Sequence, residues 1–233
     1  MKKKILPIII FILLLIGMAI FPLIPLKIFN INIENFNQNM KILYNFICDI
    51  SYMAIIFLIY RKIIIDDFYK YINNFKNNFE KSFKYYLIGL SIMIISNILI
   101  GLFFNEASAN NEEAVRNLLN LYPIYMIFSV SIYAPFVEEM IFRKSIYDSI
   151  FILKDNKITK YLYVFISGLV FSSLHIIGVS SKLIDYVYII PYLALGSAFA
   201  LLYYDSKNVF SSIVMHSMHN TVAVILYLVV GVI

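Results

Sequence analysis

Long apolar runs separated by short charged segments dominate the chain. The runs cover approximately residues 5–26, 42–60, 85–104, 161–179, 183–204 and 209–233, and a further one begins near residue 121. Each run is close to the roughly 20 residues that an α-helix needs to cross the hydrocarbon of a bilayer. The pattern predicts an all-α, multi-pass transmembrane helix bundle of about seven membrane helices.

Two segments between the apolar runs differ from the other connections. From 61 to 84 aromatic residues recur every three or four positions among lysines, which predicts an amphipathic helix lying in the membrane interface. Residues 105–120 carry more acidic than basic side chains and are expected to form a polar loop. Pro22 and Pro25 are expected to end or bend the first helix.

The 233 residues are expected to form one integral membrane domain, with no large soluble domain beside it. In this interpretation residues 1–120 are N-terminal membrane helices with the interfacial segment, and 121–233 are the candidate catalytic helices. Clusters of Lys and Arg stay in the cytoplasm. The N-terminus is therefore predicted to be cytoplasmic, with the protein in the cell membrane.

The composition excludes an ordinary soluble protein. The chain is 61% hydrophobic and 14% charged, whereas soluble domains have about 25% charged residues. The net charge of +5 comes from short Lys and Arg clusters, without a basic face or recognition motif, so nucleic acid is not an expected partner. The expected partners are membrane lipid and a membrane-associated protein or peptide. The single cysteine, Cys48, excludes an intrachain disulfide and a cysteine-rich metal site.

Two adjacent carboxylates, Glu138 and Glu139, lie in the apolar run that begins near residue 121. A carboxylate at the centre of a membrane helix costs at least about 2.5–3.5 kcal/mol on insertion scales, so packing does not explain the pair. Arg143 follows Glu139 by four residues and shares its helical face, which predicts an ion pair. Glu138 points elsewhere and is predicted to face a functional site. Pro135 is expected to kink the helix beside it.

All three histidines lie inside predicted membrane helices, His175 in the fifth run and His216 and His219 in the last. Asn220 follows His216 by four residues and shares its face. In one hydrolytic arrangement Glu138 and His175 activate water, while His216 and Asn220 donate hydrogen bonds to the oxyanion. In another, Glu138, His175 and His216 hold a zinc ion with an open water position. The residue pattern does not separate the two.

Each of these residues also has a structural interpretation. A single intramembrane histidine or asparagine commonly joins two helices by a hydrogen bond, and Glu-Glu-x-x-x-Arg alone fits an ion pair near a helix end. Their joint occurrence favours catalysis or transport. Asp49, an isolated carboxylate in the second run, is expected to have a helix-packing role.

The three motifs resemble those of the CPBP intramembrane proteases, which include type II CAAX prenyl endopeptidases and bacteriocin-processing or self-immunity proteins. The family pattern is Glu-Glu-x-x-x-Arg, Phe-x-x-x-His and His-x-x-x-Asn, in that order on three helices. The corresponding residues here are Glu138, Glu139 and Arg143, then Phe171 and His175, then His216 and Asn220. His219 lies outside the pattern.

The resemblance implies an endopeptidase that hydrolyses a peptide bond of a membrane-associated protein or peptide, which is prenylated in one branch of the family. It assigns water activation to Glu138 with His175, oxyanion stabilisation or metal binding to His216 and Asn220, and support of the site to Glu139 and Arg143. The family has been described both as metalloproteases and as glutamate proteases. Metal-independent chemistry is favoured here, because asparagine is a poor zinc ligand and suits oxyanion donation.

Two rival functions use the same residues. A non-enzymatic immunity protein would bind a membrane-active peptide without cutting it. A proton-coupled transporter would move protons through the carboxylates, although the chain lacks the two similar halves typical of many transporters.

Overall fold

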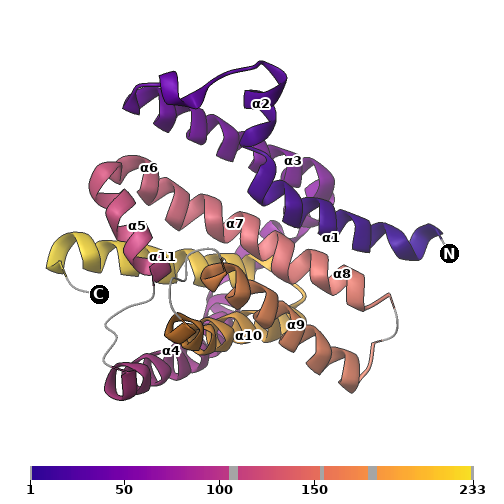
Figure 1. Ribbon diagram of the computed structural model, residues 1–233. Helices are drawn as coiled ribbons and strands as arrows, with labels where there is room; N and C mark the ends of the chain where they lie inside the picture. Colours follow the sequence, from indigo (N-terminus) through magenta and orange to yellow (C-terminus); the bar gives the residue numbers. More distant parts are fainter. Residues whose placement is uncertain (1, 105–109, 153–154, 178–182, 232–233) are drawn as a thin grey trace.

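The computed structural model describes residues 2–104, 110–152, 155–177 and 183–231, and the regular elements within these ranges are all helical (Figure 1). The first half comprises α1 (Lys2–Ile20), α2 (Leu23–Ile28), η1 (Ile33–Asn35), α3 (Gln38–Asn73), α4 (Phe75–Phe104) and α5 (Asn110–Leu121). A continuous helical span follows, made of α6 (Pro123–Phe128), η2 (Ser129–Tyr133), α7 (Ala134–Glu138), η3 (Glu139–Ser145) and α8 (Ile146–Ile150). The last elements are α9 (Lys157–Ile176), η4 (Leu183–Tyr188), α10 (Ile189–Ser206) and α11 (Val209–Val230).

The expected all-α membrane bundle is confirmed. Within the described ranges five helical spans are long and apolar enough to cross a membrane: α3, α4, the span Pro123–Ile150, η4 with α10, and α11. The predicted count of seven is not confirmed. The first run gives only a shorter apolar helix, Ile5–Ile20, and α9 is not one of the five spans.

The segment 61–84 does not form one separate amphipathic helix. Its first part continues α3 beyond a kink at Tyr60, whose backbone is not helical (φ −110°, ψ 16°), and its second part is the start of α4. The chain turns between them at Asn74. The sequence pattern identified the helical character of the segment but not the turn, because the polar residues around Asn74 also fit the exposed face of a single helix.

The expected polar loop 105–120 is wrong for residues 110–120, which belong to α5; residues 105–109 lie outside the described ranges. Glu112 and Arg116 form an ion pair one helical turn apart, at 3.3 Å. Leu119 is buried against Met126 and Val224. An amphipathic helix with a strongly polar outer face has the overall composition of a loop, so composition alone misassigned it.

The span Pro123–Ile150, which carries the Glu-Glu motif and is here named the motif span, is not a regular α-helix. Two π-helical segments, η2 and η3, flank the short α7, and Pro135 lies between them. Proline has no backbone N–H and cannot close the usual helical turn, so a wider turn nearby is a physically reasonable response. Short π-helical segments are often found at functional sites. The expected disturbance at Pro135 is therefore present as wide turns.

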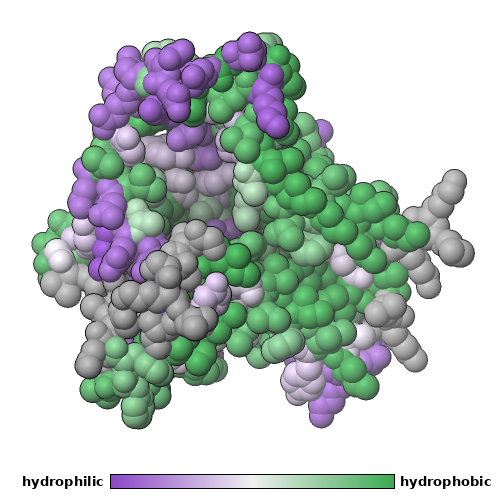
Figure 2. Space-filling view, viewed as in Figure 1, coloured by the Kyte–Doolittle hydropathy of each residue, from purple (hydrophilic) through white to green (hydrophobic). Residues whose placement is uncertain are grey.

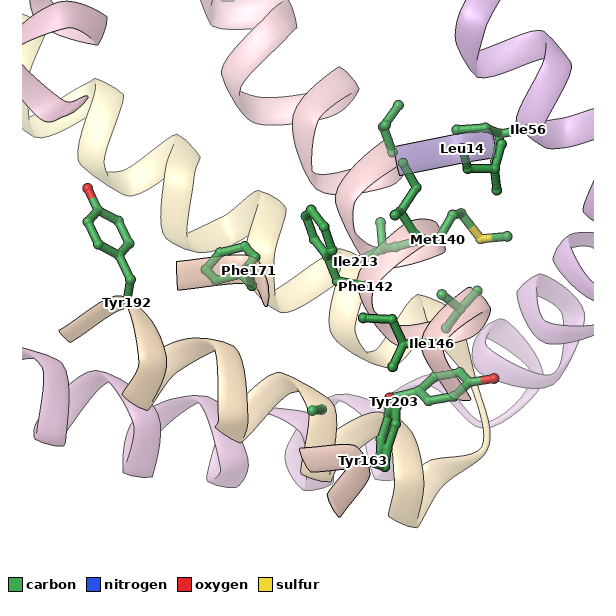
Figure 3. Packing of buried hydrophobic residues seen from close by; sticks show 14 of the residues in the cluster. Leu14, Ile56, Met140, Phe142, Ile146, Tyr163, Phe171, Tyr192, Tyr203 and Ile213 are labelled. Atoms are coloured by element: carbon green, nitrogen blue, oxygen red, sulfur yellow. The ribbon is translucent and has the colours of Figure 1, made fainter. Parts of the chain in front are cut away.

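The core lies where the N-terminal helix, the motif span and the last helices meet. Leu14 of α1, Ile56 of α3, Met140 of η3, and Tyr163 of α9 belong to one buried cluster, and Figure 3 shows several of its side chains meeting around the motif span. Helix α10 packs along both α9 and α4. Gly168 of α9 permits the close approach to α10, because a Cβ there would lie 2.3 Å from Ser197 Oγ.

The visible surface is mostly apolar. In Figure 2 hydrophilic residues gather at the top, over η1 and the start of α3, at the left, over α5, and in a smaller group at the lower right. Many large side chains along the long helices are exposed, including Leu58 of α3 and Ile88 and Leu102 of α4. A soluble protein rarely exposes such continuous apolar surface, whereas a lipid environment covers it favourably.

Candidate active site

A cavity of about 740 Å³ brings together the predicted site residues of three separate segments. Glu138 comes from α7, His175 from α9, and His216 and Asn220 from α11. The span Pro123–Ile150 and α11 contact each other directly, and α9 packs on the motif span and on α10. The fold therefore places the four candidate side chains in the wall of one space, as a shared site requires.

Glu139 and Arg143 form a fully buried ion pair beneath this cavity. Arg143 Nε donates to Glu139 Oε2 at 2.9 Å, and Nη2 donates to Oε1 at 3.1 Å. Both side chains are 0% exposed. Burial of two charges is tolerated only with such close geometry and further hydrogen bonds. The ion pair expected from the four-residue spacing is confirmed.

Ser167 completes the surroundings of the arginine. Arg143 Nη1 donates to Ser167 Oγ at 2.9 Å, and this hydroxyl donates in turn to the Phe142 carbonyl at 2.7 Å. The guanidinium also lies 5.0 Å from the centre of the Phe171 ring. Sequence reasoning missed Ser167. Its position two helical turns before His175 was the available signal, but a serine in an apolar helix is common without such a role.

His216 connects the buried pair to the cavity. Its Nδ1 is 2.9 Å from Glu139 Oε1, and its Nε2 is 3.9 Å from Glu138 Oε2. A carboxylate accepts, so Nδ1 carries the proton of the first contact. In the neutral ring Nε2 then accepts a proton, and it donates only when the ring is doubly protonated. Glu138 and Nε2 are close enough to exchange a proton through a bridging water.

Glu138 is the carboxylate that faces the cavity, as predicted. Its Oε2 is buried and makes no hydrogen bond to any of the described residues. A buried carboxylate oxygen without a partner is costly unless a bound group or water satisfies it. This atom is therefore the strongest indication that the cavity accepts a polar group.

His175 lies in another part of the wall. Its Nδ1 is 2.8 Å from the Phe171 carbonyl, which can only accept, so this nitrogen is protonated and the neutral ring keeps a lone pair on Nε2. The ring packs between Phe171 and Tyr192, at centroid distances of 4.3 and 4.7 Å. Across the described part of the chain, His216 and not His175 lies within 4.0 Å of the Glu138 carboxylate.

Asn220 is fixed by the wide turn of the motif span. Its Nδ2 donates to the Val130 carbonyl at 2.8 Å, and Val130 lies within η2. One amide proton of the side chain is used in this way, and the second is left for a group in the cavity. The sequence could not predict this contact, because it depends on the π-helical turn.

The alternative zinc site can be compared with the donor atoms present. Among the described residues, no group of three or more His, Cys, Asp or Glu side chains is arranged to hold a metal ion. Glu138 and His216 lie near each other, but His175 does not join them within contact distance.

Residues 120–222 match a family model described as type II CAAX prenyl endopeptidase Rce1-like, and this range includes every motif residue. The matched region is thus similar to the CPBP intramembrane proteases. The family resemblance inferred from the three motifs is confirmed.

Two curated relatives support the same assignment. The membrane-embedded CAAX protease MroQ of Staphylococcus aureus (strain USA300) is 29% identical over 144 residues, which cover 61% of this chain and 55% of MroQ. The membrane peptidase YdiL of Bacillus subtilis (strain 168) is 28% identical over 161 residues, covering 67% of this chain and 61% of YdiL. The alignments thus span less than two thirds of either relative. No solved structure matches the chain significantly.

Proposed function

We propose that this protein is an intramembrane endopeptidase that hydrolyses a peptide bond of a membrane-associated protein or peptide. One observation carries the proposal: the buried Oε2 of Glu138 lacks a hydrogen-bond partner among the described residues and lies in the wall of a cavity that His175, His216 and Asn220 also line. The match to the Rce1-like family model supports the reaction class.

Glu138 and His175 activate the attacking water. Water donates one hydrogen bond to Glu138 Oε2 and a second toward the lone pair on His175 Nε2, so the two side chains orient it. As the water oxygen attacks the carbonyl carbon, Glu138 takes the proton that is released. The unmatched acceptor on Glu138 and the Nδ1 contact of His175 both support these roles.

The tetrahedral intermediate carries a negative oxygen that needs donors. The second amide proton of Asn220 supplies one, and Nε2–H of a doubly protonated His216 supplies another. Glu139 orients the His216 ring, because its carboxylate lies 2.9 Å from Nδ1 and is itself held by Arg143. The Glu138 proton then passes to the leaving nitrogen, the C–N bond breaks, and a carboxylic acid and an amine result.

The substrate carries an apolar segment. The cavity wall includes Leu90 and Met93 of α4 and Val222 and Leu226 of α11. Such a surface binds apolar side chains or an attached lipid chain, because it excludes water. Membrane lipids whose shape does not match the surface compete poorly for it. A lipidated substrate is one member of this class.

The test compares membrane-derived peptides from cells that express the natural chain or Glu138→Gln at equal levels. We expect peptides that occur only with the natural chain, and a loss of at least about 100-fold with Glu138→Gln. Glu80→Gln makes the same chemical change at an exposed position of α4 and serves as the matched control. Identical peptide profiles for correctly inserted natural and Glu138→Gln proteins would refute proteolysis and favour the immunity function.

A further inference from the structure

His219 is the one histidine that the family motifs do not use, yet it lies in the wall of the same cavity. Its Nδ1 is 3.4 Å from the hydroxyl of Tyr86, which comes from α4. Across the described residues its other ring nitrogen, Nε2, makes no hydrogen bond. The histidine therefore keeps one polar atom for a group bound in the cavity.

The position of Tyr86 is fixed by its surroundings. The residue is 6% exposed, and its ring stacks on Phe199 with an interplanar angle of 12°. The Tyr86 and His219 rings meet edge to face at 5.9 Å. Both rings of the pair are thus held in place before any ligand binds, which reduces the entropy lost on binding.

A second polar atom lies farther along α4. Asn97 lines the cavity, and its Oδ1 is buried without a hydrogen-bond partner among the described residues. A buried amide oxygen in this state is costly unless a ligand or water donates to it. Asn97 is therefore an acceptor that points to a bound donor, independently of His219.

Tyr86 and Asn97 lie on one face of α4. Eleven residues separate them, which is about three helical turns and about 16 Å along the axis. Between them Leu90, Met93 and Ile94 also line the cavity. The face thus presents a polar group, an apolar stretch and a second polar group. Extended peptide advances about 3.3 Å per residue, so roughly five residues would span the distance.

We infer that this face of α4, with His219 of α11 beside Tyr86, is the substrate-binding wall: it holds an extended, apolar peptide of about five residues, with His219 and Asn97 bonded to backbone groups at its two ends. The inference rests on the proposed function and adds the residues that set its specificity. Helix α4 lies outside the range 120–222 that matches the family model. His219 and Asn97 are positioning residues in this assignment, because neither contacts the reacting bond.

Binding can be measured without hydrolysis in the Glu138→Gln background. The probe is a fluorescein-labelled apolar pentapeptide amide, titrated by fluorescence anisotropy against the protein in micelles. We expect His219→Phe and Asn97→Leu each to weaken binding roughly 5- to 10-fold, the effect of one hydrogen bond. His219→Gln retains an N–H donor and should recover most of the affinity. If His219 had only a structural role, the affinity for the peptide would not recover when His219→Gln restores the N–H donor.

Ser96→Ala is the matched control on α4, because Ser96 bonds its own helix at the Ile92 carbonyl and does not line the cavity. A labelled dipeptide amide is too short to reach both polar groups. Its affinity should therefore fall in at most one of the two variants, His219→Phe or Asn97→Leu. Two results would overturn the inference: no saturable binding of the pentapeptide, or equal binding by His219→Phe, Asn97→Leu and Ser96→Ala. Failure of the proposed function would be seen separately, in the cell experiment, if the natural chain cleaved no membrane-associated substrate.

Discussion

His216 Nδ1 lies 2.9 Å from Glu139 Oε1, so the buried Glu139–Arg143 pair extends directly to a side chain of the candidate site. The two neighbouring glutamates thereby have different environments. Glu139 is enclosed by an arginine and a histidine, whereas Glu138 keeps an unmatched oxygen toward the cavity. Substitutions of Glu139 or Arg143 should therefore affect mainly the stability of the protein, whereas substitutions of Glu138 should affect mainly its activity.

Arg143→Met should destabilise the protein by about 3–5 kcal/mol, because it leaves the Glu139 carboxylate buried with its main counter-charge removed. The measurement is unfolding of the purified protein in mixed micelles. The double variant Glu139→Gln with Arg143→Met removes both charges and should recover part of the loss. A double variant no more stable than Arg143→Met would contradict this account of the pair.

Asp67→Ala should loosen the start of α11. Asp67 Oδ2 accepts a hydrogen bond from the Val209 N–H at 3.0 Å, and the loss of a helix cap typically costs about 1 kcal/mol. Hydrogen exchange should quicken at the first turn of α11, measured by mass spectrometry. Asp67→Asn keeps an acceptor and should behave nearly as the natural chain. Asp66→Ala, at an exposed neighbour, is the control, and equal exchange in Asp66→Ala and Asp67→Ala would count against the cap.

Gly168→Ala should destabilise the contact between α9 and α10. The added Cβ would lie 2.3 Å from Ser197 Oγ and 3.1 Å from the Ser197 backbone nitrogen, so the helices must separate. Overpacking of this kind costs about 1–3 kcal/mol. Since α9 carries His175, cleavage activity should fall together with stability. Ser173→Ala on the same helix is the comparison, and unchanged melting of Gly168→Ala would disprove the close approach.

Lys207→Met should destabilise the turn between α10 and α11 by about 1 kcal/mol. The Lys207 ammonium donates to the Tyr147 hydroxyl at 2.6 Å and lies 3.8 Å from the centre of the Tyr204 ring. Lys207 also has a positive φ of 49°, which glycine adopts more easily. Lys207→Gly loses the same side-chain contacts as Lys207→Met, but glycine suits this backbone conformation. Lys207→Gly should therefore be destabilised less than Lys207→Met. Equal melting temperatures of the natural chain and Lys207→Met would contradict the proposed contribution.

The same lysine predicts a pH dependence. Burial lowers the pKa of Lys207, although Asp155 and Asp205 oppose that shift. The folded protein then releases this proton at a lower pH than the unfolded chain does. Stability of the natural chain relative to Lys207→Met should therefore rise as the pH increases toward the ordinary lysine pKa. Melting curves of the two proteins at neutral and alkaline pH measure this difference, and a constant or falling difference would refute it.

The sequence by itself determined the features that depend on neighbours along the chain. Apolar runs long enough to span a bilayer predicted the all-helical membrane bundle, and a spacing of four residues predicted the Glu139–Arg143 pair. The motif order identified the family resemblance, and isolated polar residues in apolar helices singled out Glu138, His175, His216 and Asn220 as candidates. Local helical geometry is enough for each of these inferences.

Tertiary structure decided the contacts between segments that are distant in the chain. It placed His216 on Glu139, Asn220 on the Val130 carbonyl and Tyr86 on His219, and it turned residues 110–121 into a helix. These contacts depend on how the helices rotate against one another and on the wide turns beside Pro135. A one-dimensional pattern specifies which face of a helix is polar, but only packing in three dimensions fixes which other helix that face meets.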